Sequence, residues 1–203
     1  MRRFISALVG AAAVSVVLAG CSGGDEPLPP LSGTVLQNPY AVSSTSLADT
    51  EGSRFSLTEQ TDKPLTLVFF GYTQCPDICP RVLNNLASAM VRLDDDERAD
   101  LDVVFVTTDP ARDDGPTIRS YLDAIDPSFI GVTADLDTII EVGDSLKLYV
   151  SDGEELPSGG YDLGGHTTST IAIDRDDQAY VYWSDTTSPA EFADDIRTLL
   201  QDA

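Results

Sequence analysis

Two cysteines separated by three residues are the side chains of this sequence best suited to chemistry. They are Cys75 and Cys79, in the segment TQCPDICPR. On a helix, residues four apart share a face, and their Cα atoms lie about 6 Å apart, within the roughly 4.4–6.8 Å that a disulfide spans. The same spacing suits two thiolates that bind one soft metal ion. The pair therefore predicts a reversible disulfide, a metal site, or both.

The only histidine of the chain, His166, is the third candidate. A lone histidine is more often structural than functional. Together with two thiolates, however, an imidazole would complete a three-coordinate soft site that suits Cu(I) and is also usable by Cu(II). Zinc fits this set of side chains less well, because structural zinc sites usually have four protein ligands.

An apolar run and an amphipathic segment flank the two cysteines and must position them. Residues 65–70 (LTLVFF) have the length and composition of a buried strand, and residues 82–90 repeat apolar side chains at helical spacing. Because proline is favoured at the first helical position, we expect the helix to begin at Pro80, with Cys79 as its N-cap. A start at Pro76 is the alternative, but it would place Pro80 inside the helix. In both cases the sulfurs lie near a helix N-terminus, where the dipole favours thiolate.

The rest of the chain alternates strand-like and helix-like segments. Short β-like pieces within residues 33–55 predict an N-terminal hairpin. The later pattern predicts strands at 101–107, 168–174 and 179–184, and helices at 114–125, 135–146 and 188–200. This order predicts a single α/β domain over residues 33–203, with a thioredoxin-like fold, an N-terminal β-hairpin and insertions.

A polar, glycine-rich segment, residues 151–165, precedes His166. Four of its last seven residues are glycine, which tolerates many backbone states. We therefore expect this loop to move easily. The two thiols would capture a metal ion first, and His166 would then close over it as the third ligand.

The first 20 residues have the features of a secretory signal, since two arginines precede an apolar run rich in small residues. The run ends in LAGC, which resembles a bacterial lipobox in which Cys21 is lipidated and becomes the mature N-terminus. Plain cleavage that leaves a free Cys21 is the alternative. Residues 21–32 would form a flexible tether. We expect a protein that is lipid-anchored at the extracytoplasmic face of a bacterial cell membrane.

The chain is strongly acidic, with 34 Asp and Glu against 12 Lys and Arg and a formal net charge of −22. Loss of residues 1–20 would remove two arginines and no acidic residue, so the net charge would become −24. Such a surface argues against binding to nucleic acid and against electrostatic attraction to anionic lipid. It suits a basic patch on a partner protein or a salty habitat.

The segment GYTQCPDICP, residues 71–80, resembles the signature of the Sco/SenC family, which helps to assemble the copper centre of cytochrome c oxidase. Residues 105–113 (FVTTDPARD) resemble the second block of that family, and His166 lies where the family has its histidine. Gly165 stands where the family often has Asp, so this position supplies no carboxylate beside the histidine. The resemblance covers about residues 33–200.

The resemblance implies that Cys75, Cys79 and His166 are copper ligands, for Cu(I) or Cu(II). It implies two partners, the copper-bearing subunit of cytochrome c oxidase and an upstream copper donor. The expected function is copper delivery to the oxidase or maturation of its copper centre, by a metallochaperone rather than an enzyme with turnover.

Two other functions remain open. One is an extracytoplasmic thiol–disulfide reductase that acts on the copper-ligand cysteines of the oxidase, with Cys75 or Cys79 as nucleophile. Thioredoxin-type enzymes have two residues between their cysteines, and the three found in this chain favour metal binding. The other is a peroxidase-like sensor with Cys75 as the peroxidatic thiol.

Three charged residues, Asp109, Arg112 and Asp113, follow the predicted strand at 101–107. We expect them near the turn at residues 71–80 that carries Cys75 and Cys79, called the cysteine turn below. Arg112 would pair with Asp77 or with a neighbouring acid. A role in helix capping and loop bracing is at least as compatible with these residue types, and we do not count them as ligands.

Overall fold

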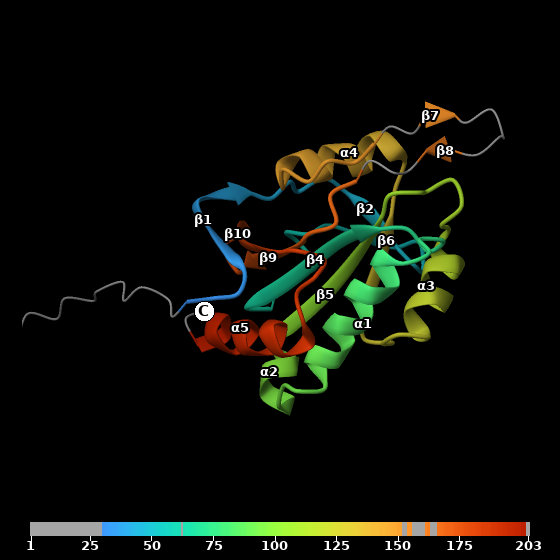
Figure 1. Cartoon of the computed structure of the whole chain (residues 1–203). Helices are drawn as coiled ribbons and strands as arrows, with labels where there is room; N and C mark the ends of the chain where they lie inside the picture. The colour runs from blue at the N-terminus through green and yellow to red at the C-terminus, as the bar shows by residue number, and fades with distance from the viewer. Residues whose placement is uncertain (1–29, 62, 152–153, 156–160, 163–165, 202–203) are drawn as a thin grey trace, which may run out of the picture.

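The computed structural model describes residues 30–61, 63–151, 154–155, 161–162 and 166–201 (Figure 1). The predicted signal segment, Cys21 and most of the predicted tether at 21–32 lie outside these residues, as does most of the segment at 151–165. Within the described residues, no helix is both long and apolar enough to span a membrane.

A mixed β-sheet forms the centre of the domain. Its strands, within the described residues, are β1 (Thr34–Ala41), β2 (Leu47–Asp49), β3 (Arg54–Phe55), β4 (Leu65–Gly71), β5 (Leu101–Thr107), β6 (Ile130–Thr133), β9 (Thr170–Asp174) and β10 (Gln178–Trp183). They are ordered β1-β10-β9-β4-β5-β6-β2-β3. The pairs β4–β5 and β5–β6 are parallel, and the remaining pairs are antiparallel. A separate two-stranded sheet joins β7 (Glu154–Glu155) to β8 (Tyr161–Asp162).

Helices cover both faces of the sheet (Figure 1). They are α1 (Ile78–Met90), α2 (Asp95–Ala99), α3 (Gly115–Asp123), α4 (Leu136–Ser145) and α5 (Pro189–Gln201). Side chains alternate between the faces of β4, so Leu67 and Phe69 pack in the core with α1, α3 and α5, whereas Val68 and Phe70 pack with α4. Every residue of β4 is buried, as expected for a central strand covered on both sides. The predicted α/β domain is confirmed.

The N-terminal region differs in its pairing from the single hairpin expected over residues 33–55. A hairpin is present, but it is the short one between β2 and β3. Strand β1 instead pairs with β10 at the opposite edge of the sheet. Strand β10 pairs with β9 along one side, so its other side is available to β1, whereas β2 extends the sheet beyond β6. Strand pairing of this kind is long-range, and local sequence pattern does not determine it.

Acidic and hydroxyl side chains begin most of the helices. Asp94, Asp114 and Asp135 each accept the backbone N–H of the residue three positions later, at 2.8–3.0 Å. Helix α5, predicted over residues 188–200, begins with a capping box: Ser188 N–H donates to Glu191 Oε2 at 2.8 Å and Glu191 N–H donates to Ser188 Oγ at 3.3 Å. Part of the acidic composition therefore serves local structure.

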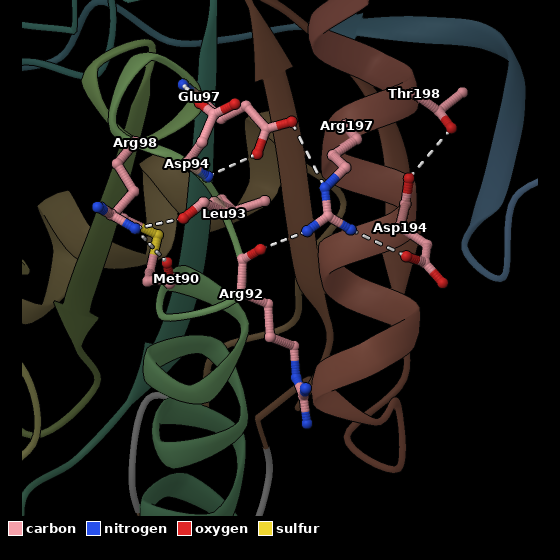
Figure 2. Close-up of polar contacts among 9 residues, drawn as sticks. All are labelled: Met90, Arg92, Leu93, Asp94, Glu97, Arg98, Asp194, Arg197 and Thr198. Carbon is pink, nitrogen blue, oxygen red and sulfur yellow. Dashed lines mark hydrogen bonds and ion pairs between the residues drawn. The ribbon is translucent and has the colours of Figure 1, made fainter.

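Arginines from other segments hold the C-terminal end of α1 (Figure 2). The guanidinium of Arg98 donates to the carbonyl oxygens of Met90, at 3.3 Å, and Leu93. Arg197 of α5 donates to the carbonyl oxygen of Arg92 and pairs with Glu97 at 3.4 Å. Cationic side chains suit the free carbonyls at a helix end, and α1 has no basic residue in its own last turn. This end of α1 is thereby fixed, with the cysteines at the other end.

Candidate metal centre

The cysteine turn lies where β4 and β5 end side by side. The last residues of these parallel strands, Gly71 and Thr107, are paired in register. The cysteine segment follows β4 and leads into α1, while the segment from Thr108 to Asp114 follows β5 and leads into α3. Thr108 N–H donates to the carbonyl oxygen of Gly71 at 2.7 Å, which joins the two segments. The carboxyl ends of such strands are where open α/β sheets usually place their chemistry.

Helix α1 begins two residues earlier than the sequence predicted. Its N-cap is Asp77, so Ile78 is its first residue and Pro80 its third. The expected arrangement, with Cys79 as N-cap and Pro80 first, is wrong. The first N–H groups of a helix have no carbonyl partner within it, so proline fits the third position without losing a hydrogen bond. The first helical bond runs from Arg81 N–H to Asp77 O at 3.3 Å.

The sulfur of Cys75 occupies the usual place of a capping side chain. Among the described residues, the side chain of Asp77 accepts no capping hydrogen bond from α1. Instead, Cys79 N–H donates to Cys75 Sγ at 3.3 Å. Burial alone would raise the pKa of the Cys75 thiol, but the Cys79 side chain and nearby backbone N–H groups donate hydrogen bonds to it, and together they lower that pKa. The expected preference for thiolate near the helix N-terminus therefore applies to Cys75.

Cys79 is in the opposite situation. Its side chain is fully buried in the core beneath α1, and burial raises the pKa of its thiol far above the ordinary value. The Cys75 sulfur raises it further, because the Cys79 S–H donates to it. Neither cysteine is in a disulfide within the described part of the chain. The pair is thus unequal, with one accessible, activated thiol and one buried, protonated thiol.

His166 lies across a hollow from Cys75. This hollow has a volume of about 250 Å³ and is lined by Tyr72, Cys75, Pro76, Asp77, Ile78, His166 and Thr168. The rings of Tyr72 and His166 meet edge to face, with centroids 5.8 Å apart at 89°. Backbone pairing between Val150 and His166, and a 2.9 Å bond from Thr167 N–H to Tyr149 O, hold the histidine segment.

The imidazole of His166 is in a form that can ligate a metal. Its Nδ1 lies 3.2 Å from Thr167 O. A carbonyl oxygen only accepts, so Nδ1 carries the proton and Nε2 keeps its lone pair. Burial lowers the pKa of His166, although the bond to Thr167 opposes that shift, so the ring remains neutral at a lower pH than an ordinary histidine.

The three predicted ligands are neighbours but do not form a closed site. Among the described residues, no group of three His, Cys, Asp or Glu side chains is close enough to hold a metal ion. Cys75 and Cys79 are adjacent, and His166 faces Cys75 across the hollow. The donor set, two thiols and a neutral imidazole, nevertheless fits the soft metal ion Cu(I). His166 must therefore approach the sulfurs if all three bind one ion.

The second sequence block braces this site. Arg112 pairs with Asp109 rather than with Asp77, and it donates to Gln74 Oε1 at 3.4 Å. Asp113, which is fully buried, accepts hydrogen bonds from the cysteine turn. These contacts agree with the loop-bracing role considered for the block, and they place it next to the cysteine turn as expected.

Two residues of the site were not singled out from the sequence. Tyr72 lines the same hollow as Cys75 and His166, and burial together with the two cysteine sulfurs raises the pKa of its hydroxyl. Gly71 leaves room for a sulfur, because a Cβ there would lie 2.9 Å from Cys79 Sγ. Their positions at the junction of a buried strand and the cysteine motif were the signal that could have identified them.

Comparisons with known proteins agree with this site. A family model described as SCO1/SenC matches residues 36–201. A SCO2-like protein of Rickettsia conorii is 30% identical over 199 residues, which cover 95% of this chain and 93% of that protein. The mitochondrial SCO2 protein of Saccharomyces cerevisiae is 31% identical over 136 residues, which cover 63% of this chain and 45% of that protein. The chain therefore matches about half of the yeast protein and nearly all of the rickettsial one.

Solved structures share the fold. Apo Sco1 of Thermus thermophilus has a TM-score of 0.75 and 27% identity, over 84% of this chain and 97% of that one. ScoI of Bradyrhizobium japonicum, solved with copper bound, has a TM-score of 0.66 and 28% identity, over 79% of this chain and 96% of that one. BsSco, described as a member of the Sco family of cytochrome c oxidase assembly proteins, has a TM-score of 0.65 over 82% of this chain and 98% of that one. Its identity is 19%, so it shows likeness of fold alone.

These matches confirm the thioredoxin-like fold predicted for the domain. The match to the family model extends from β1 to the end of α5 and includes the cysteine turn, the second block and His166. The chain belongs to the SCO1/SenC family.

Proposed function

We propose that this protein binds copper through Cys75, Cys79 and His166 and delivers it to cytochrome c oxidase, or matures the copper centre of that enzyme. The observation that carries the proposal is the pairing of an accessible, activated Cys75 thiol with a neutral His166 ring across one hollow. The match to the SCO1/SenC family supports it, as does the Bradyrhizobium protein, which was solved with copper bound.

The unequal cysteines suggest an order of binding. Copper enters from the hollow and meets Cys75 first, because Cys79 is fully buried. Cys79 then releases its proton to solvent and becomes the second thiolate ligand. His166 follows with Nε2, and its approach closes the site. Since His166 is attached to a different segment from the cysteines, a ligand of the partner can replace it from the open side during transfer.

His166→Ala tests the ligand set. We expect the reduced variant to lose about tenfold or more in Cu(I) affinity, measured by competition with a chelator, because a ligand bond is lost. Tyr149→Ala is the matched control: it truncates an aromatic ring that is 60% exposed on the segment bonded to Thr167, and it should leave the affinity unchanged. Equal affinity of His166→Ala and wild type would contradict the role of His166.

We further propose that the protein receives copper from an upstream donor while it is anchored by lipid on Cys21, at the extracytoplasmic face of a bacterial membrane. The support is the LAGC sequence that precedes the tether. Cys21→Ala should move the protein from the membrane to the soluble fraction with its fold intact. Firm retention of the variant in the membrane fraction would remove this support.

Thiol–disulfide exchange is the second candidate function, and the unequal pair favours Cys75 as its nucleophile. The Cys75 thiolate would attack a disulfide of the partner, form a mixed disulfide and release one partner thiolate. Cys79 would lose its proton and attack Cys75 Sγ, releasing the second partner thiolate. This chain would end with a Cys75–Cys79 disulfide and the partner with two thiols. Because exchange does not need His166, His166→Ala should reduce copper binding and leave exchange largely unchanged.

A further inference from the structure

A fully buried carboxylate lies beside the cysteine turn. Asp113, between β5 and α3, has no exposed surface. It accepts hydrogen bonds from Thr73 N–H at 2.9 Å, Thr73 O–H at 2.5 Å and Thr107 O–H at 2.7 Å. Within the described residues it forms no ion pair with a basic side chain, so these three donors compensate for its lost hydration.

Thr73, which supplies two of these donors, lies inside the turn that leads to the first cysteine. The turn is closed by a 3.2 Å bond from Cys75 N–H to Tyr72 O. Cys75 Sγ then accepts Cys79 N–H at 3.3 Å. Hydrogen bonds, linked by the short backbone of the turn, therefore connect Asp113 to the first residues of α1.

The other side of Asp113 is rigid. Thr107 is the last residue of the buried strand β5, and its hydroxyl also accepts Asp109 N–H at 3.0 Å. Asp113 N–H donates to Asp109 O at 2.9 Å. The carboxylate is thus fixed to the sheet, and Thr73 is fixed to the carboxylate. Cys75 itself is only partly buried, so its own packing provides less restraint.

We propose that Asp113 is a positioning residue for Cys75. By holding Thr73, it keeps the 72–75 turn in the conformation that places Cys75 Sγ at the N-terminus of α1 beside Cys79. The consequence for copper rests on the proposed function, but the geometric role applies to the metal-free protein and can be measured there.

The test is amide hydrogen exchange at Cys79 in the reduced, metal-free protein, because this N–H is the donor to Cys75 Sγ. Thr73→Val keeps the shape of the side chain and removes the hydroxyl donor, and Asp113→Asn replaces a carboxylate oxygen with an NH₂ group. Both should accelerate Cys79 exchange about tenfold or more, as expected when a hydrogen bond to a charged acceptor is lost. Thr73→Ser, which keeps the hydroxyl, should exchange like wild type.

Thr138→Val is the matched control. Thr138 also donates its N–H and O–H to one carboxylate, that of Asp135, at 3.0 and 2.9 Å, but it does so at the start of α4. The amides of β5 report global opening of the fold. They should exchange at the wild-type rate in Thr73→Val, while Cys79 alone is accelerated.

Two results would overturn the proposal. One is unchanged Cys79 exchange in both Thr73→Val and Asp113→Asn. The other is equal acceleration of Cys79 and of the β5 amides in Thr73→Val, which would mean a general loss of stability. Cu(I) affinity is measured separately on the same variants. If Cys79 exchange accelerates and Cu(I) affinity stays at the wild-type level, the positioning role in the metal-free protein stands and its consequence for copper binding fails.

Discussion

Gly71→Ala probes the space that the second sulfur occupies. An added Cβ would lie 2.9 Å from Cys79 Sγ, 3.0 Å from Phe69 Cε1 and 3.1 Å from Phe105 Cε2. All three neighbours are fully buried, so none can move into solvent. Overpacking of a well-packed core costs about 1–3 kcal/mol, and we expect a loss of about 2 kcal/mol in the free energy of unfolding. Denaturant unfolding of the metal-free protein measures it.

The same variant should weaken Cu(I) binding, because relief of the clash displaces Cys79 Sγ. We expect a loss of about tenfold in affinity, which corresponds to about 1.4 kcal/mol. Gly52→Ala is the control: its φ of +83° makes alanine strained, but a Cβ there meets nothing within 4 Å. It should lower stability by about 1 kcal/mol and leave copper affinity unchanged. Wild-type stability and affinity in Gly71→Ala would refute this reasoning.

Two further predictions concern the thiols and the N-terminal edge. The pKa of the Cys75 thiol is lowered and that of the Cys79 thiol is raised, so alkylation of Cys75 by iodoacetamide should reach half its maximal rate at a lower pH than alkylation of an ordinary cysteine thiol, while folded Cys79 stays unreactive. A Cys75 midpoint at or above the pH found for the ordinary thiol would contradict the geometry. Asp195→Ala should lower the free energy of unfolding, measured in denaturant, by about 3 kcal/mol. The reason is that Trp183 Nε1–H, which lies 2.7 Å from the Asp195 carboxylate, and donors of Ser32 and Gly33 lose their acceptor. A loss below about 1 kcal/mol would show that water replaces the carboxylate.

The cysteine site could be predicted from local sequence because its signals are local. An apolar strand, a Cys-x₃-Cys spacing and an amphipathic helix follow one another within residues 65–90. The first residue of α1 could not be fixed in the same way. Pro80 is compatible with both the first and the third helical position, since neither position has an N–H that must be bonded within the helix.

The braces around the site could not be predicted, because they depend on contacts between distant residues. Thr73 and Asp113 are 40 positions apart and meet only because β4 and β5 are parallel and in register. The choice of Asp109 rather than Asp77 as the partner of Arg112 is likewise set by the loop that follows β5. The edge-to-face contact between Tyr72 and His166 requires the end of the sheet to be assembled first.

The central claim is that both cysteine sulfurs are copper ligands. Its most direct test is Cu(I) stoichiometry, measured with a competing chelator, on the reduced protein and on the same protein with Cys75 and Cys79 joined in a disulfide. We expect one copper per chain in the reduced form and much less in the oxidised form, because a sulfur held in a disulfide is no longer a thiolate ligand. Equal copper binding by the two forms would contradict the two-thiolate site.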